Sequence, residues 1–437
     1  MLVFFLRAPL IRSFNIGFGN LGTGPSMDTT AATLLSKHSN AFGLEVLNAL
    51  SPEADGTKET EILSPYGLIH ALSMLLPASG EGSTAHAALL KVLFKGFPNE
   101  QGAKTAMHSL SAMLKDAHSE GILEFCEGNA AFVSKRIELK DAYQETLASS
   151  YDANVFPLET AAQVNGWVSK ATKEKITEII DDTTAAQVSL ILINAIYFKG
   201  LWEEQFNPAD TNMQPFFTMD GSQVNAPLMY LKYDKGPAVS GYEFTTSGNI
   251  PCVAVRMQYK GGAFSAVFSM PTDDVKQAQG PLTLESGMLY GKALATCQRE
   301  FLTALSTGHV KWKAVGPHGY SSAKIFLPSF ELTCDYSLGT LLQNLGLSSI
   351  FKPGDFTRLA NVDDLFVSDV KQKVYVKVDE KGTEAAAVTS IMMMRAMIQP
   401  MNELFVKFDR PFHMSIVHND TGLALFTGIV ENPVEQK

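Results

Sequence analysis

Ten consecutive residues near the middle of the chain, Ser189–Phe198, form an apolar run of Leu, Ile, Ala, Tyr and Phe that is interrupted by Asn194. An apolar run of this length without polar alternation is typical of a strand that is buried on both faces. The chain must therefore supply covering layers for both sides of that strand.

Helical spacing of apolar residues dominates the chain before this strand, and strand patterns dominate after it. The expected helices are one from Asp28 that includes Leu34 and Phe42, then Leu68–Leu76, Ala85–Phe94, Ala103–His118, Lys140–Tyr151 and Trp167–Ile180, with a short strand at Ala130–Ser134. The expected later strands are Cys252–Gln258, Phe264–Met270, Ala323–Leu327, Lys373–Val378, Leu404–Phe408, His413–His418 and Ala424–Val430. The residues 419–422, Asn-Asp-Thr-Gly, suit a hairpin turn. Thr272–Ser322 is expected to be rich in loops at its ends. This order indicates an α+β domain.

Composition limits the function classes. The 437 residues are 46% apolar and 18% charged, as in a packed globular protein. The net charge of −10 argues against a nucleic-acid partner. No apolar run reaches the roughly 20 residues of a membrane span. We expect one domain over 27–437, preceded by an extension over 1–26. That extension carries Arg7 and Arg12 and no acid. Either it is a weak targeting segment or, as we favour, Met27 is the true start.

Metal, disulfide and enzyme chemistry find little support in the sequence. Cys126, Cys252, Cys297 and Cys334 are widely separated, and neither they nor the histidines show metal-ligand spacing. We expect four thiols, no metal and no cofactor. There is no GxSxG, HExxH or P-loop, and no GxGxxG that opens a helix, so we expect the protein not to be an enzyme.

The stretch Val378–Pro400 is the most informative part of the sequence. As a strand of period two, it places Thr383, Ala385, Ala387 and Thr389 on one face and Glu384, Ala386, Val388 and Ser390 on the other. Such a strand could be buried on its first face and leave Glu384 in water. On spacing alone, an Ala-rich helix followed by a Met-rich core segment is the favoured interpretation, because periodicity leaves short apolar runs ambiguous.

Several motifs in order resemble the serpin family over about Thr33–Pro433. The segment 380–387, Glu-Lys-Gly-Thr-Glu-Ala-Ala-Ala, is similar to the hinge of inhibitory serpins, especially of the intracellular, ovalbumin-like members. Further similar segments are Ser64-Pro65, Asn165–Val168, Asn194–Trp202, Leu327–Phe330, Leu365–Val370, Asp409–Phe412 and Thr421–Gly428. The resemblance implies the serpin fold, with about nine helices, three sheets and an exposed reactive-centre loop.

The resemblance also implies a mechanism. A serine protease attacks the exposed loop, and the cut loop enters the central sheet and traps the acyl-enzyme. The implied hinge residues are Glu380, Gly382, Thr383, Glu384, Ala385, Ala386, Ala387, Val388 and Thr389. The reactive bond is either Arg395–Ala396, which suits a trypsin-like protease and which we slightly favour, or Ala396–Met397, which suits an elastase-like protease. The alternative is a non-inhibitory serpin that acts as a binding or chaperone protein.

Some positions depart from the family pattern in the regions below and at the top of the central sheet. Ser64, Asn194 and Trp202 are retained, but Gly67 replaces a usual serine and Gln372 a usual histidine, so the hydrogen bonds there must be rearranged. Ser329 replaces a lysine that often pairs with the hinge glutamate, here Glu380. We therefore expect faster loop insertion and easier self-polymerisation on warming.

The expected partners are trypsin-like or elastase-like serine proteases, with no nucleic acid and no membrane. The early helices contain no cluster of Lys and Arg, so we do not expect activation by heparin. We expect a monomer that can form loop–sheet polymers. The resemblance to intracellular members favours a cytoplasmic location and leaves a secreted or host-exposed one open.

Overall fold

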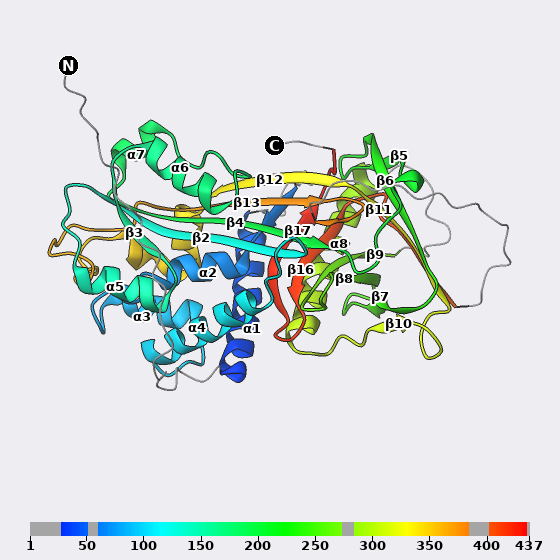
Figure 1. Cartoon of the computed structure of the whole chain (residues 1–437), viewed down its shortest axis with the longest axis horizontal. Coiled ribbons are helices and arrows are strands. Elements are labelled where there is room, and N and C mark those ends of the chain that lie inside the picture. The colour runs from blue at the N-terminus through cyan, green and yellow to red at the C-terminus, as the bar shows by residue number, and fades with distance from the viewer. Residues whose placement is uncertain (1–27, 51–59, 273–283, 384–401, 435–437) are drawn as a thin grey trace, which may run out of the picture.

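The apolar run of the sequence forms the centre of a sheet. The computed structural model describes residues 28–50, 60–272, 284–383 and 402–434, and the extension predicted at 1–26 lies outside them. Strand β4 (Leu190–Leu201) lies between β13 (Asp369–Val378) and β2 (Leu123–Ser134), with β12 (Phe330–Ser337) and β3 (Asn154–Leu158) at the edges. In Figure 1 these long strands follow the long axis of the molecule. We call this the central sheet.

Both faces of the central sheet are covered, as the continuous apolar run predicts. Ile191, Ile193 and Tyr197 face a cluster that includes Val164 and Val168 of helix α6 (Ala161–Ala171). The alternate residues of β4 belong to the main core on the opposite face, where helix α2 (Pro65–Ser73) lies. The period of two along β4 therefore divides its side chains between two layers.

The other helices surround this frame. They are α1 (Thr29–Leu50), α3 (Thr84–Leu93), α4 (Glu100–Asp116), α5 (Asp141–Ser150), α7 (Asp182–Gln187), α8 (Leu284–Ser306) and α9 (Gly339–Leu342), with short helical turns at Pro208–Asp210, Gln343–Leu347 and Ser348–Phe351. Helices α3, α4 and α5 gather at one end of the molecule, away from β5–β8 (Figure 1).

Two further sheets complete the fold. One has the order β1 (Glu61–Leu63), β17 (Leu423–Val430), β16 (Phe412–His418), β9 (Phe264–Pro271), β8 (Pro251–Gln258), β7 (Gly236–Thr245) and β10 (Lys313–Val315). The other has the order β15 (Glu403–Lys407), β11 (Ser322–Pro328), β6 (Gln223–Tyr233) and β5 (Asn212–Phe217). Nine helices and three sheets in the described ranges agree with the predicted α+β class.

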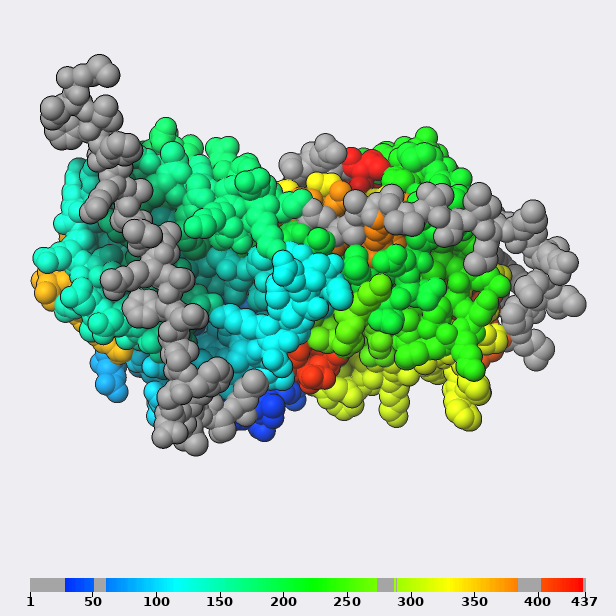
Figure 2. Space-filling model, in the orientation of Figure 1, coloured from blue at the N-terminus to red at the C-terminus, as the bar shows by residue number. Residues whose placement is uncertain are grey.

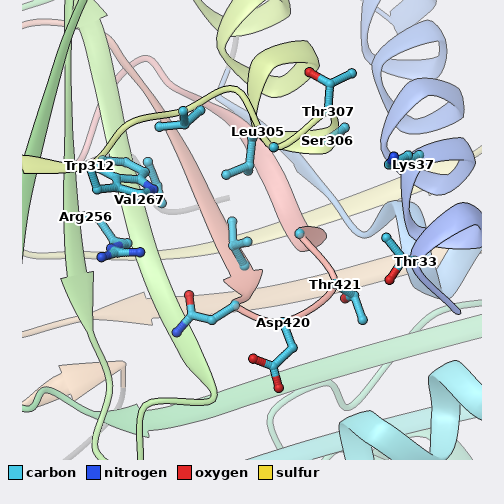
Figure 3. Close-up of a pocket in the computed structure, with 15 residues that line it drawn as sticks. Thr33, Lys37, Arg256, Val267, Leu305, Ser306, Thr307, Trp312, Asp420 and Thr421 are labelled. Atoms are coloured by element: carbon cyan, nitrogen blue, oxygen red, sulfur yellow. The ribbon is translucent and has the colours of Figure 1, made fainter. Parts of the chain in front are cut away.

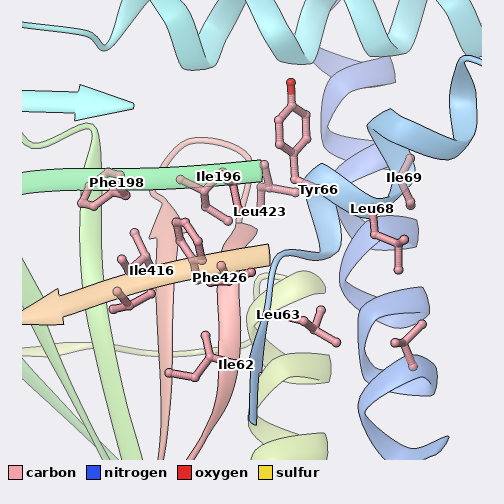
Figure 4. Close-up of a cluster of buried hydrophobic side chains, with 14 of the residues drawn as sticks. Ile62, Leu63, Tyr66, Leu68, Ile69, Ile196, Phe198, Ile416, Leu423 and Phe426 are labelled. Carbon is pink, nitrogen blue, oxygen red and sulfur yellow. The ribbon is translucent and has the colours of Figure 1, made fainter. Parts of the chain in front are cut away.

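The main core joins the layers. Figure 4 shows Tyr66 and Leu68 of α2 in the same cluster as Ile196 of β4 and Phe426 of β17. The space-filling view in Figure 2 shows the elongated outline that results, with the early helices at one end and the strands of residues 212–260 at the other.

One local prediction was wrong and one helix was not predicted. The helix predicted at Trp167–Ile180 begins at Ala161 and ends at Ala171, and the residues that follow are irregular. The 23-residue helix α8 lies inside Thr272–Ser322, for which only loop-rich ends were predicted. The predicted turn at residues 419–422 is present, with Gly422 at a φ of 68°.

Candidate functional site

The site centres on a boundary between two parallel strands. β13 and β4 pair directly from Asp369 opposite Ile191 to Tyr375 opposite Tyr197. We call this boundary the seam. A strand placed between two parallel strands has the same orientation to both, and if it is antiparallel its pairing is slightly more stable per residue. The seam can therefore accept a new strand without reversing either neighbour.

The hinge begins where that new strand would start. After β13 the chain turns at Asp379–Gly382, and β14 (Gly382–Thr383) pairs antiparallel with β4, opposite Leu201 and Gly200. A Cβ atom at Gly382 would collide with the backbone oxygen of Gly200. Glycine is therefore required at 382 for this close approach.

Thr383 is held at the top of the sheet. Its side chain is fully buried, and its hydroxyl hydrogen-bonds to the Tyr259 hydroxyl at 2.7 Å. Burial raises the pKa of Tyr259, so the phenol stays neutral. The Trp202 ring stacks on Tyr259 at 4.6 Å, and its indole N–H donates to the Asp379 carbonyl at 3.0 Å. These aromatic rings fix the position of the hinge turn.

Glu380 has a partner that the sequence did not suggest. Its carboxylate accepts a hydrogen bond from the Thr211 hydroxyl at 2.7 Å, and its carbonyl accepts one from the Phe206 N–H at 2.8 Å. The absence of a lysine at Ser329 therefore leaves the hinge glutamate with a neutral partner, so the top of the sheet retains a side-chain tether.

Below the middle of the seam, the departures from the family pattern fit together. Gln372 of β13 accepts from the Ser64 N–H at 3.0 Å and donates to the Ser64 carbonyl at 3.0 Å and to Asn194 Oδ1 at 2.7 Å. A Cβ-borne side chain at Gly67 would collide with the Asn194 amide. The glycine thus makes room for Asn194. Gln372, at the position of the family's usual histidine, supplies the hydrogen bonds to Ser64 and, across the seam, to Asn194.

Two groups of predicted residues differ in what the structure says of them. Ser64, Asn194, Trp202, Gln372, Glu380, Gly382 and Thr383 lie along the seam or at its top. Glu384, Ala385, Ala386, Ala387, Val388 and Thr389 of the hinge, and Arg395, Ala396 and Met397 of the reactive bond, lie outside the described residues.

Sequence reasoning missed the partners of these residues. Tyr259 and Thr211 lie more than 100 positions from the hinge residues they contact, and His70 and Glu127, which extend the network below the seam, are 57 positions apart. No local pattern in one sequence marks such pairs.

A separate cavity of about 310 Å³ lies between α1, the end of α8 and the seven-stranded sheet (Figure 3). Arg256 of β8 packs over the Trp312 ring at 5.0 Å and donates to Ser240 Oγ at 3.3 Å, while its Nε is buried without a hydrogen-bond partner. Burial lowers the pKa of Arg256, yet a guanidinium remains charged in proteins. Valines and Leu305 supply an apolar lining.

Three further features concern residues 28–50, 60–272, 284–383 and 402–434. No helix there is long and apolar enough to cross a membrane. No group of three or more His, Cys, Asp or Glu residues there is placed to hold a metal ion. Cys252, Cys297 and Cys334 are buried, Cys126 is half-buried, and none of these four cysteines forms a disulfide.

Comparison with known proteins identifies the family. The family model of the serpins, described as serine protease inhibitors, matches residues 37–433. The chain belongs to the serpin family. Leukocyte elastase inhibitor A of Mus musculus is 29% identical to this serpin over 409 residues, which cover 91% of this chain and 99% of that protein.

Solved structures have the same fold. The thermophilic serpin tengpin in its native state aligns with a TM-score of 0.74 at 21% identity, over 94% of this serpin and 97% of that chain. A thyroxine-binding globulin in complex with thyroxine aligns with a TM-score of 0.70 at 21% identity, over 93% and 100%. The family is described as one of protease inhibitors rather than catalysts, and its partners are serine proteases.

Proposed function

We propose that this serpin is a suicide substrate that disarms serine proteases by inserting its cleaved loop into the seam. The observation that carries the proposal is the juxtaposition of a closed seam with a strand already started beside it. β13 and β4 pair directly below, while Gly382–Thr383 runs antiparallel to β4 above. The next residues need only continue in that direction to form a full strand.

The chemistry is that of an interrupted proteolysis. The protease serine oxygen adds to the carbonyl carbon of the reactive bond, the peptide C–N bond breaks, and the new amino terminus leaves. The acyl-linked segment stays attached to the sheet through Thr383. Insertion of about 14 residues at about 3.3 Å each carries the protease roughly 45 Å. Distortion at the end of that path prevents water from completing the hydrolysis.

The small residues after the hinge support insertion. Ala385, Ala386 and Ala387 add no bulk or charge to either face of the incoming strand. A hinge with a charge or a proline here would place an unpaired charge in the core or interrupt the ladder of hydrogen bonds. The hinge sequence therefore favours an inhibitor over a non-inhibitory member.

The bait is proposed to be Arg395, with Ala396 as the alternative residue before the cut. An arginine would fill a trypsin-like pocket with an acidic floor, whereas Ala396 would suit the small pocket of an elastase. We further propose a cytoplasmic location and a monomeric state, with loop–sheet polymers formed on heating.

Incubation with trypsin and with elastase, followed by a denaturing gel, tests the function. We expect a denaturant-resistant complex together with a cleaved chain. The new amino terminus is Ala396 if the bond is Arg395–Ala396, and Met397 if it is the next one. Cleavage without any complex and without a rise in thermal stability would contradict the proposal.

The cavity beside Arg256 favours a second candidate, a binding protein. Its lining combines a half-buried cation with the Trp312 ring and apolar side chains, which suits an aromatic anion. The dye 8-anilinonaphthalene-1-sulfonate is a direct probe. Binding that weakens about tenfold in Arg256→Gln, in a protein that forms no protease complex, would favour this candidate.

A further inference from the structure

Helix α2 bridges the seam, because its two ends are bonded to strands on opposite sides of it. At its N-terminus, the Ser64 backbone N–H donates to the Gln372 side-chain oxygen, and the Gln372 side-chain N–H donates to the Ser64 carbonyl. Each hydrogen bond is 3.0 Å long, and Gln372 belongs to β13. Near its C-terminus, His70 Nδ1 lies 3.1 Å from the Glu127 carboxylate and 3.0 Å from Asn129 Nδ2. Glu127 and Asn129 belong to β2, which pairs with β4 on the far side of the seam.

The dimensions of the bridge match the closed sheet. His70 lies six positions after Ser64, which corresponds to a rise of about 9 Å along the helix axis. Two strand spacings separate β13 from β2, also about 9–10 Å. An inserted strand adds a third spacing, so the separation grows to about 14 Å. A helix cannot lengthen by that amount, and one end must release.

A chain of hydrogen bonds with a fixed direction connects the two ends. The Ser64 backbone N–H can only donate, so Gln372 Oε1 accepts and its Nε2 donates to Asn194 Oδ1. Asn194 Nδ2 then donates to Asn129 Oδ1 at 2.9 Å. This leaves the Asn129 amide N–H directed at His70 Nδ1, so the chain of amides is complete only when that nitrogen accepts a hydrogen bond.

Glu127 makes the opposite demand on the same nitrogen. His70 Nε2 donates to the Tyr151 carbonyl at 2.5 Å, so Nδ1 of a neutral ring carries a lone pair. That lone pair would face a carboxylate that is 9% exposed. With a proton on Nδ1 the ring donates to Glu127 in a charge-assisted bond, and Asn129 must turn its N–H away. The proton therefore decides how α2 is joined to β2.

We propose that α2 is a clamp across the seam. The proton between His70 and Glu127 determines how strongly the C-terminal end of α2 is bound to β2. The inference rests on the proposed strand insertion and adds His70 and Glu127 to it as positioning residues. With the proton, an ion pair joins α2 to β2. Without it, the lone pair opposes the carboxylate, the second end is weakened, and the sheet opens there.

The surroundings of His70 determine the pH range. Burial alone would lower the pKa of His70, but the charge of Glu127, the hydrogen bond with it and the Tyr151 carbonyl raise that pKa above 6.5. A cavity of about 220 Å³ reaches His70. The titratable or charged groups around it in the described residues are Glu127 of β2, Tyr66 of α2, Tyr151 and Asp152 after α5, and His108 and Lys115 of α4. Lys115 pairs with Asp152 at 2.5 Å.

The sign of the effect follows from linkage. The raised pKa belongs to the clamped state, so the clamp is strongest below about pH 6.5 and weakens as pH rises through the raised value. Insertion should accelerate over the same range. A synthetic peptide with the sequence of residues 383–394 provides a direct probe, because it can enter the seam without any protease. With an acetylated amino terminus and an amidated carboxyl terminus, its single ionisable group is Glu384, which is charged throughout pH 6–9.

The test measures the rate of peptide insertion from pH 6 to pH 9. We expect a rise of about tenfold in the wild type, equivalent to about 1.4 kcal/mol. His70→Gln and Glu127→Gln should each remove the step. His86→Gln is the matched control, since His86 also pairs with a glutamate, Glu100, at 3.1 Å but lies away from the seam. The clamp is overturned if the pH-dependent rise in insertion rate survives in both His70→Gln and Glu127→Gln. It is also overturned if that rise disappears in the His86→Gln control.

Imidazole titration by NMR provides a second measurement. The pKa of His70 should return toward its ordinary value once the peptide is inserted, and an unchanged pKa would contradict release at this end. The two proposals fail in different ways. A peptide that never inserts overturns strand insertion itself, whereas insertion at a rate independent of pH overturns the clamp alone.

Discussion

At the scale of single residues, the positions below the seam have adapted to one another. Gly67, Asn194 and Gln372 are all fully buried, so each polar group needs a partner. The missing side chain at 67 is compensated by an amide that fills the space, and the glutamine reaches both Ser64 and Asn194. Restoring one family-typical residue alone should therefore be harmful.

Gly67→Ser should lower the stability of the protein by about 1–3 kcal/mol, because the added Cβ collides with the Asn194 amide. Thermal unfolding followed by circular dichroism measures the loss. Gly166→Ser is the matched control, since Gly166 also lies in a helix and a Cβ there meets nothing within 4 Å. Equal unfolding temperatures for the two variants would show that the site repacks freely.

Thr383→Arg should convert the inhibitor into a plain substrate. The position is fully buried against Tyr259, and an arginine there would place an unpaired charge inside the sheet. The yield of protease complex on a denaturing gel should fall at least about tenfold while cleavage continues. Glu384→Arg, which the period-two pattern assigns to the opposite face of the proposed inserted strand, should keep the complex. Equal yields from both variants would argue against strand insertion.

At the scale of elements, sequence patterns located most strands and several helices but failed where packing overrode local preference. Ile176, Ile179 and Ile180 continue the helical spacing of α6, yet Lys173 and Glu174 have positive φ and the Asn165 side chain binds the backbone of Ile179 and Ile180. The isoleucines are buried from an irregular segment. A 3.6-residue period therefore persisted without a helix.

Helix α8 escaped prediction for the opposite reason. Gly287 and Gly291 lower its intrinsic helix preference. Both lie against Met219, where a Cβ at Gly287 would collide with the Met219 carbonyl. The glycines permit close packing rather than a turn. At the site, the resemblance predicts the hinge residues, but the partners of Glu380 and Thr383 come from remote segments that only the fold brings together.

The hinge turn is an element whose tether can be tested. Thr211→Val removes the hydroxyl that binds the Glu380 carboxylate at 2.7 Å while keeping the shape of the side chain. Losing a hydrogen bond to a charged group costs about 1 kcal/mol or more. We expect oligomers to form about fivefold faster on mild heating, as measured on a native gel. Thr146→Val is the control, because that hydroxyl is exposed and binds only within its own helix. No change relative to this control would show that the tether is dispensable.

At the scale of the whole molecule, buried histidines connect stability to pH. Burial lowers the pKa of His413 to about 3, and burial also lowers the pKa values of His418 and His38, whereas the pKa of His70 is raised. Three of these four shifted pKa values, that of the half-buried His38 included, therefore oppose acidification. The fold should be most stable above about pH 6.5 and should weaken toward acid.

The expected contribution of His413 is calculable. The unfolded chain binds a proton at this side chain below about pH 6.5, but the folded chain does so only near pH 3. The free energy of unfolding should fall by about 1.4 kcal/mol per pH unit between these values. Urea unfolding at several pH values measures the slope, which His413→Gln should reduce by that amount. A slope unchanged by the substitution would assign the acid sensitivity to other groups.

Under the proposed insertion, the seam opens to accept one strand only, and this has a consequence for dosage. Once filled, it offers no second vacancy, and the bond that was cut is not remade. Each molecule is thus spent on a single encounter, and a population of such molecules behaves as a titrant. Proteolysis is absent while the inhibitor molecules outnumber the released protease molecules. It appears abruptly when the last inhibitor molecule has been used. The number of chains present, rather than an affinity, sets where that threshold falls.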